Sequence, residues 1–184
     1  RKTLDAMFDA LFANVELPRR ILRAKAKQMG QSGVGWFDLG APLDLPNQAK
    51  LSWDKAKITV RESFARAYPA LGDVFQEQVI HKSWVDWEPR PGKRPGGFCT
   101  SSMLSKESRI FLTYNDSLGD VLPLAHESGH AFHGYLMRDI RPYARGYPMT
   151  LAETASTFGE QVLMNGLLDD PAVSDAQKAM MLDV

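Results

Sequence analysis

The sequence has little cysteine, no excess charge and no long apolar run, and each shortage excludes a class of protein. One cysteine in 184 residues cannot form an internal disulfide and fits a reducing compartment, so we expect a cytoplasmic protein. Lys+Arg and Asp+Glu both number 22, which gives no electrostatic signal for binding nucleic acid or an anionic membrane. The sequence shows no run of eighteen apolar residues and no signal peptide, so we expect no membrane partner.

The most informative motif is an H-E-x-x-H pentapeptide that runs from His126 to His130 in a helix-compatible segment. Residues four apart lie on one face of a helix, so both imidazoles can point at one metal ion. Glu127 lies about 100° further round the helix, close enough to reach a metal-activated water without being a ligand. This pattern is typical of zinc peptidases, in which the metal polarises a carbonyl and the glutamate takes the proton of the water.

The alternative to a metal site is that these are surface or core histidines on an amphipathic helix. An accidental H-E-x-x-H is expected in fewer than roughly one in a hundred chains of this size. Three of the four histidines fall between His126 and His133, which also favours a site. We therefore expect one Zn²⁺ ion per chain.

A catalytic zinc site usually needs a third protein ligand, and Glu153 is the best candidate. The metzincin pattern is excluded, because His133 stands where its glycine is required and Leu136 stands where its third histidine is required. A turn near Gly146 can reverse the chain and bring a second helix, with Glu153, against the first. The alternative is that Glu153 forms a capping box with Thr150 at the start of that helix.

The motif and its surroundings resemble the thimet oligopeptidase and oligoendopeptidase F family of zinc metallopeptidases, on the oligoendopeptidase F branch. The resemblance lies in the eight residues from His126 to His133, in the segment Ala-Glu-Thr-Ala-Ser around Glu153, and in residues 88–100 and 108–114. It implies that His126, His130 and Glu153 bind zinc and that Glu127 is the catalytic base. It also implies hydrolysis of short, unstructured oligopeptides.

Members of that family are far longer than this chain, so we expect residues 1–184 to be part of the catalytic domain of a longer peptidase. A later segment of the family, which supplies Tyr and His residues that bind substrate and stabilise the oxyanion, has no match here. The competing hypothesis is therefore a zinc-binding chain that is catalytically incomplete or a non-catalytic scaffold. Glu127 argues against a degenerate site, because a structural site needs no base.

The apolar spacing predicts a mainly α-helical fold with a small β-hairpin beside the H-E-x-x-H helix. Within a single domain we expect a helical segment over 1–82, a loop with short strands over 83–116 and the zinc-binding helices over 117–184. The individual predictions are helices over 2–13, 18–29, 52–67 and 69–82, a loop over 31–50, and a helix capped near Asp120.

Two short strands are predicted, one from Gly97 to Ser101 and one from Arg109 to Tyr114, joined by residues 102–108. Either strand is a candidate edge on which an extended substrate could add as a further strand. The alternative is a hairpin that only packs against the helix.

Roles can also be suggested for several other residues outside the expected zinc ligands. Glu160 is a candidate acceptor for a ligand imidazole, or an exposed helix residue. His133 is expected to pack at the rim of the site rather than bind zinc, since a fourth ligand would close the open position. Cys99 is expected to be a small buried strand residue. The basic loop over 90–94 could hold a substrate carboxylate, although such loops are usually only solvated.

Overall fold

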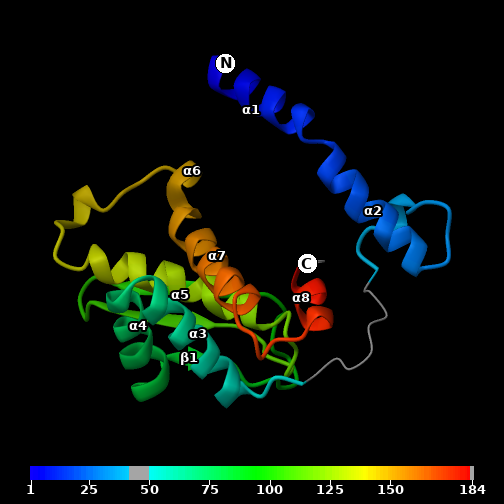
Figure 1. The fold of residues 1–184 in the computed structure, drawn as a ribbon. Helices are drawn as coiled ribbons and strands as arrows, with labels where there is room; N and C mark the ends of the chain where they lie inside the picture. The colour runs from blue at the N-terminus through cyan, green and yellow to red at the C-terminus, as the bar shows by residue number, and fades with distance from the viewer. Residues whose placement is uncertain (42–49, 183–184) are drawn as a thin grey trace. The chain divides into compact units, whose positions relative to one another are not determined.

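Two helices form the first part of the chain in a computed structural model that describes residues 1–41 and 50–182 (Figure 1). Helix α1 (Lys2–Ala13) and helix α2 (Glu16–Gln28) are followed by a 3₁₀ turn at Trp36–Asp38. Gly30 follows Met29, the C-cap residue of α2, and has a positive φ of 67°, the left-handed conformation that ends many helices. Part of the loop predicted over 31–50 lies outside the described residues.

The described residues divide into two compact units, one carrying α1 and α2 and the other running from α3 to Met181. The expectation of a single domain over 1–184 stays a prediction. The larger unit holds the H-E-x-x-H motif. Its helices are α3 (Trp53–Ala67), α4 (Pro69–Phe75), a π-helix (Gln76–His81), α5 (Val121–Leu136), a 3₁₀ turn (Pro142–Ala144), α6 (Met149–Ala152), α7 (Thr154–Leu168) and α8 (Asp175–Leu182).

The core of the larger unit lies where α3, α4, α5 and α7 bring their apolar faces together. Phe64, Leu71, Leu124 and Leu163 are almost fully excluded from solvent, and each comes from a different one of these helices. Burial of such side chains is the main favourable term in folding. The inner face of α5 is thereby fixed, which orients the rest of that helix.

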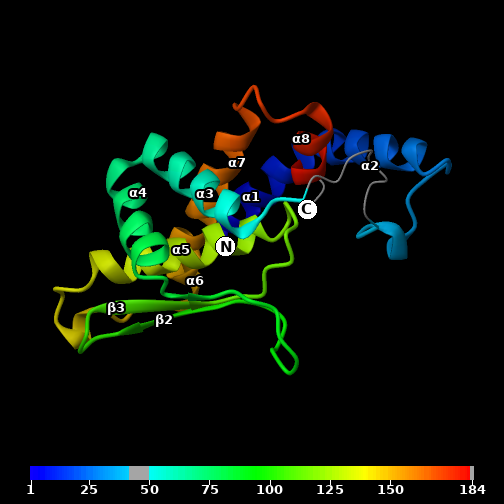
Figure 2. The ribbon, with the colours of Figure 1, turned by 90° about the horizontal axis from the view of Figure 1, so that it is seen from below.

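A three-stranded sheet with the strand order β1-β3-β2 lies beside α5, with helices over one of its faces (Figure 2). Strands β2 (Phe98–Ser102) and β3 (Glu107–Phe111) form an antiparallel hairpin in which Phe98 pairs with Phe111. Strand β1 (Val85–Asp86) pairs with β3 in parallel. The outer edge of β2 therefore has no neighbouring strand among the described residues.

The mainly helical fold with a small sheet is confirmed, and several details of the expectation were wrong. Strand β1 lies in a segment that was predicted to be a loop. It was missed because a strand of two residues is too short to show an alternating apolar pattern. The helix predicted over 69–82 changes to a π-helix after Phe75, a distinction that apolar spacing does not make. The strand predicted from Arg109 to Tyr114 is not an edge strand, since β3 is paired on both sides.

Helix starts were placed well, although the predicted caps were not formed. Ser52 and Asp120 occupy the N-cap positions of α3 and α5, yet neither side chain bonds to its helix. The Asp120 carboxylate instead accepts the backbone N–H groups of Asn115 and Ser117, which lie before the helix. No helix of the described residues is long and apolar enough to cross a membrane.

Candidate metal centre

Helix α5 presents His126 and His130 on one face, as the four-residue spacing predicts. The two ring centroids lie 4.9 Å apart. The side chains are 27% and 22% exposed, so both are partly shielded but open to a ligand. The opposite face of α5, with Leu124 and Ala125, is buried in the core.

Glu153 reaches the histidines from a break between two helices. Helix α6 ends at Ala152, α7 begins at Thr154, and Glu153 between them has φ −88° and ψ 0°. The capping box with Thr150 is not formed: α6 begins at Met149, two residues earlier than that box requires, and its N-cap Pro148 makes no side-chain bond. The carboxylate of Glu153 is therefore not used as a helix cap.

The close packing of α5 on α7 brings Glu153 within reach of the histidines. A Cβ atom at Gly129 would lie 2.8 Å from the Cα of Ser156, and one at Gly159 would lie 2.7 Å from the carbonyl oxygen of Ala125. Side chains at these positions would hold the helices apart. Glycine at both positions lets the two backbones approach.

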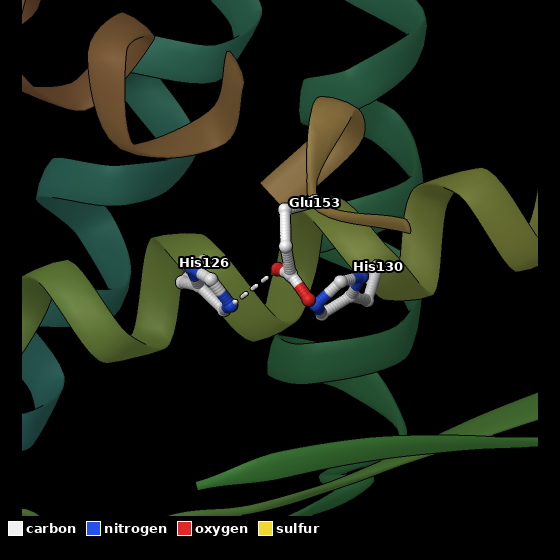
Figure 3. Close-up of side chains that lie close together, drawn as sticks. All are labelled: His126, His130 and Glu153. Carbon is white, nitrogen blue, oxygen red and sulfur yellow. Dashed lines mark ion pairs between the residues drawn. The ribbon is translucent and has the colours of Figure 1, made fainter. Parts of the chain in front are cut away.

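The donor atoms of His126, His130 and Glu153 converge on one point (Figure 3). Glu153 Oε2 lies 3.3 Å from His126 Nε2 and 3.2 Å from His130 Nε2. Taken one atom per residue, the potential ligand atoms all lie within 4.8 Å of one another. Two imidazole nitrogens and a carboxylate oxygen are a donor set that suits a divalent transition metal, with room for a further ligand.

The electrostatics of the group favour the protonation states that bind metals. Burial is the largest cause that lowers the pKa of His130, which favours the neutral imidazole. The hydroxyl of Ser156 is the main cause that lowers the pKa of Glu153, which favours the carboxylate. Metal ligands must be deprotonated, so both shifts act in the same direction.

Glu127 lies beside this group without belonging to it. Its side chain is buried, and its Oε2 atom has no hydrogen-bond partner among the described residues. Burial is the main cause that raises the pKa of this carboxyl group, so its charged form is held in a poorly solvated place. A Cβ atom at Gly97 would lie 3.0 Å from Glu127 Oε1, so the absence of a side chain at Gly97 leaves room for the carboxylate.

A cavity of about 660 Å³ opens in front of these residues. Its lining includes His126, Glu127, His130 and Glu153, together with residues 97–101 at the start of β2. Met137 and Tyr147 line it from the segment between α5 and α6. The exposed edge strand and the potential metal ligands therefore face the same space.

The structure gives Glu160 and His133 different surroundings. Glu160 Oε1 lies 2.6 Å from His126 Nδ1, the ring nitrogen that does not face Glu153. The ring of His133 packs on Tyr147 with the centroids 4.9 Å apart, and its Nδ1 atom is buried without a partner among the described residues. His133 is not part of the group of three potential ligands.

The basic loop over 90–94 is held by hydrogen bonds to neighbouring residues of the chain and is not simply exposed to solvent. Arg90 makes two hydrogen bonds to the Asp86 carboxylate, at 2.6 and 2.7 Å. Lys93, whose side chain is 1% exposed, bonds to Asp86 Oδ1 and to the backbone oxygens of Asp86 and Glu88. These contacts hold the loop that leads into β2.

Sequence reasoning did not place Ser156 or Tyr147 at the site, and it considered Gly97 only as the first residue of a candidate substrate strand. Ser156 lies three residues after Glu153, the spacing of neighbours on one helix face, so its contact could have been anticipated. Tyr147 lies in an irregular segment, and no periodic signal places it at the cavity. The role of Gly97 depends on a contact with α5, which lies thirty residues further along the chain.

Comparison with known proteins agrees with this geometry. The sequence pattern of Peptidase family M3 matches residues 56–182, which include every residue of the group. The chain belongs to this family.

Relatives of this M3 chain are much longer than it is. An oligoendopeptidase F homolog of Lactococcus lactis is 29% identical over 173 residues, covering 92% of this chain and 28% of the relative. Oligopeptidase PepF of Bacillus subtilis is 26% identical over 167 residues, covering 90% of this chain and 25% of the relative. A crystal structure of a Chlamydophila abortus protein assigned as a peptidase superposes with a TM-score of 0.79 at 27% identity, covering 100% of this chain and 30% of that one.

Proposed function

We propose that this chain is the metal-binding part of a zinc metalloendopeptidase that hydrolyses short, unstructured oligopeptides. The observation that carries the proposal is the convergence of His126, His130 and Glu153 beside a buried glutamate, Glu127. Membership of the M3 family and the names of the relatives support it. In this proposal the three converging residues bind zinc, and a zinc ion bound there lowers the pKa of water and polarises a peptide carbonyl.

Glu127 acts as the general base. Glu127 is one of the residues that line the cavity, and its buried Oε2 atom has no hydrogen-bond partner among the described residues, so the carboxylate is not engaged elsewhere and can accept a proton from water. The raised pKa of its carboxyl group makes it a better base than an exposed glutamate. The same atom then returns the proton to the leaving amine.

Glu160 fixes the tautomer of His126. A carboxylate can only accept a hydrogen bond, so Nδ1 donates to Glu160 Oε1 and the lone pair of Nε2 is left for the metal. His133 contributes through packing, since its ring lies against that of Tyr147 with the two planes tilted by 31°.

Strand β2 provides the binding surface for an extended peptide. Its outer edge is not paired within the described part of the chain, and it begins at the cavity. Main-chain hydrogen bonds to such an edge recognise backbone rather than sequence, which suits a range of oligopeptides. Residues 97–101 are therefore the proposed substrate-binding segment, and a folded protein would not present a free strand to it.

The proposal covers only part of a working enzyme. This chain spans 28% of the length of the Lactococcus relative, and we propose that further chain completes the substrate site. The cytoplasmic location and the lack of nucleic-acid and membrane partners remain predictions from composition.

The deciding experiment is Glu127→Gln. The amide is nearly isosteric and removes no zinc ligand, so zinc content and helical signal should not change. When the same substitution is made in the full-length parent protein, hydrolysis of a quenched fluorescent peptide should fall at least about 10²–10⁴-fold, the usual contribution of a general base. Glu62→Gln is the matched control, because Glu62 is an exposed residue on α3 away from the cavity.

Two results would contradict the proposal. Zinc loss in Glu127→Gln would make this residue structural, and unchanged hydrolysis would remove it as the base. If the full-length parent protein binds zinc but shows no chelator-sensitive hydrolysis, the non-catalytic alternative is favoured.

A further inference from the structure

Ser156 contacts the same carboxylate oxygen that faces the two histidines. Its hydroxyl donates to Glu153 Oε2 at a distance of 2.7 Å. That oxygen also lies 3.3 Å from His126 Nε2 and 3.2 Å from His130 Nε2. A carboxylate oxygen has two lone pairs, so one can accept the hydroxyl while the other faces the metal position.

The hydroxyl hydrogen of Ser156 has one open acceptor nearby. The backbone oxygen of Glu153 is 3.0 Å from Ser156 Oγ, but it already accepts the amide of Thr157 at 3.0 Å and the hydroxyl of Thr157 at 2.6 Å. A carbonyl oxygen has two lone pairs, and Thr157 uses both. The hydrogen of Ser156 is therefore directed to the carboxylate.

Water cannot replace this hydroxyl. Ser156 is fully buried, and its Cα lies where a side chain on Gly129 would have to go. Glu153, in contrast, has a side chain that is 59% exposed and stands at the break between α6 and α7. Such a side chain loses considerable rotamer freedom when it is fixed, so a buried donor on the next turn lowers the cost of holding it in place.

We propose that Ser156 is a positioning residue of the metal site, which holds one oxygen of Glu153 at the point where His126 and His130 converge. The inference rests on the proposed function, because it assumes that these three residues bind the metal. Residues that orient metal ligands commonly contribute 10–100-fold to metal affinity. Loss of the Ser156 hydroxyl should weaken zinc binding by about that factor.

The test is a zinc titration of Ser156→Ala against a competing chromophoric chelator. The dissociation constant should rise about 10–100-fold. Gln161→Ala is the matched control: it shortens a polar side chain of the same helix that, among the described residues, bonds to Asn165 and not to Glu153. Its zinc affinity should equal that of the unaltered chain.

Stability without zinc separates positioning from a purely structural role. Alanine favours a helix more than serine does, so Ser156→Ala should fold, and its metal-free melting temperature should stay close to that of Gln161→Ala. A lower metal-free melting temperature with unchanged zinc affinity would overturn the proposal. If Ser156→Ala does not fold, Ser156→Cys, whose thiol is a weak donor, should show a smaller loss of affinity, and full affinity would overturn the proposal.

Glu153→Ala distinguishes failure of this inference from failure of the proposed function. If zinc affinity falls in Glu153→Ala but not in Ser156→Ala, the metal site stands and the role of Ser156 is wrong. If Glu153→Ala binds zinc as tightly as the unaltered chain, the metal site itself is wrong and the inference fails with it. In a Glu153→Ala background, Ser156→Ala should cause no further loss.

Discussion

Two of the three potential metal ligands are held by a neighbour that does not itself face the metal position. Glu160 contacts His126 Nδ1, and Ser156 contacts the Glu153 carboxylate. Both neighbours lie on α7, and both contacts are charge-assisted hydrogen bonds, which are stronger than neutral ones. At the scale of single residues, affinity should therefore depend on side chains outside the ligand set.

Glu160→Ala tests the support of His126. We expect zinc affinity to fall about 10–100-fold, because the His126 ring loses the acceptor that fixes its tautomer. Glu160→Gln should lose less, since the amide oxygen can still accept. Zinc titration with a competing chelator gives the affinities, and Gln161→Ala is the control, because among the described residues the side chain of Gln161 bonds to Asn165 alone. Equal affinity in Glu160→Ala and the control would leave Glu160 without this role.

Cys99 provides a test of the environment around Glu127. Burial, and secondarily the charge of Glu127, raises the pKa of the Cys99 thiol to about 12, with a hydrogen bond to Ser108 acting in the opposite direction. The thiolate is the reactive form, so a raised pKa means slower alkylation at a given pH. At pH 8 we expect iodoacetamide to react at least about 100-fold more slowly with the folded chain than with the chain in denaturant.

The pH dependence of the alkylation rate shows whether the pKa of Cys99 is raised. In the folded chain the pKa of Cys99 is about 12, so at pH 10 the thiol is still mostly protonated. The thiolate fraction, and with it the alkylation rate, should therefore still increase as the pH is raised through 10. In the unfolded chain the rate should level off near the ordinary thiol pKa. Because the chain has one cysteine, all label reports on Cys99. If the alkylation rate of the folded chain levels off near pH 9, the pKa of the Cys99 thiol is not raised by burial.

At the scale of elements, the contact between α5 and α7 decides whether the site exists. The two halves of the ligand set lie on α5 and immediately before α7, so the separation of the helices sets the distance between Glu153 and the histidines. Gly129 and Gly159 stand at the closest approach. Protein interiors are close-packed, so one added methyl group there has to move a helix.

Gly129→Ala should reduce the free energy of unfolding by about 1–3 kcal/mol, the usual cost of overpacking. Chemical denaturation of the metal-free chain measures this change. Gly146→Ala is the control, because a Cβ atom at Gly146 would meet nothing within 4 Å. Zinc affinity should fall in Gly129→Ala as well, since the added methyl group pushes α7 away. Two equally stable variants would mean that the helices pack less closely than described.

At the scale of the whole molecule, a bound metal would join parts of the chain that are distant in sequence. The ligands lie on α5 and at the junction of α6 and α7, two segments that are already packed together in the larger unit. A ligand that binds only the folded state stabilises it by mass action. A zinc ion bound at these residues should therefore stabilise the folded state of this unit.

Thermal unfolding should show this coupling. At free zinc one hundred times the dissociation constant, the folded state gains about 2.7 kcal/mol, which corresponds to a rise of about 5–10 °C in melting temperature. Addition of a chelator should reverse the rise. Metal analysis should find one zinc per chain, and Glu153→Ala should show a much smaller shift. An equal shift in Glu153→Ala would place the bound zinc elsewhere.

The sequence by itself determined the helical part of the site. The positions of His126, Glu127 and His130 on one helix follow from a period of 3.6 residues, which is a local property. Helix starts at α3 and α5 were readable from Ser52 and Asp120, because residues of this type favour N-cap positions even where their side chains find other partners. The mainly α-helical class followed from the same local patterns.

Only the tertiary structure decided which distant residues meet. The position of Glu153 depends on the close packing of α5 and α7. It also depends on the break between α6 and α7, which no local sequence pattern predicts. The inner place of β3 depends on the two-residue strand β1, which is too short to show a period. Spacing along the chain specifies a face of one helix, whereas the distance between two elements is set by the side chains packed between them.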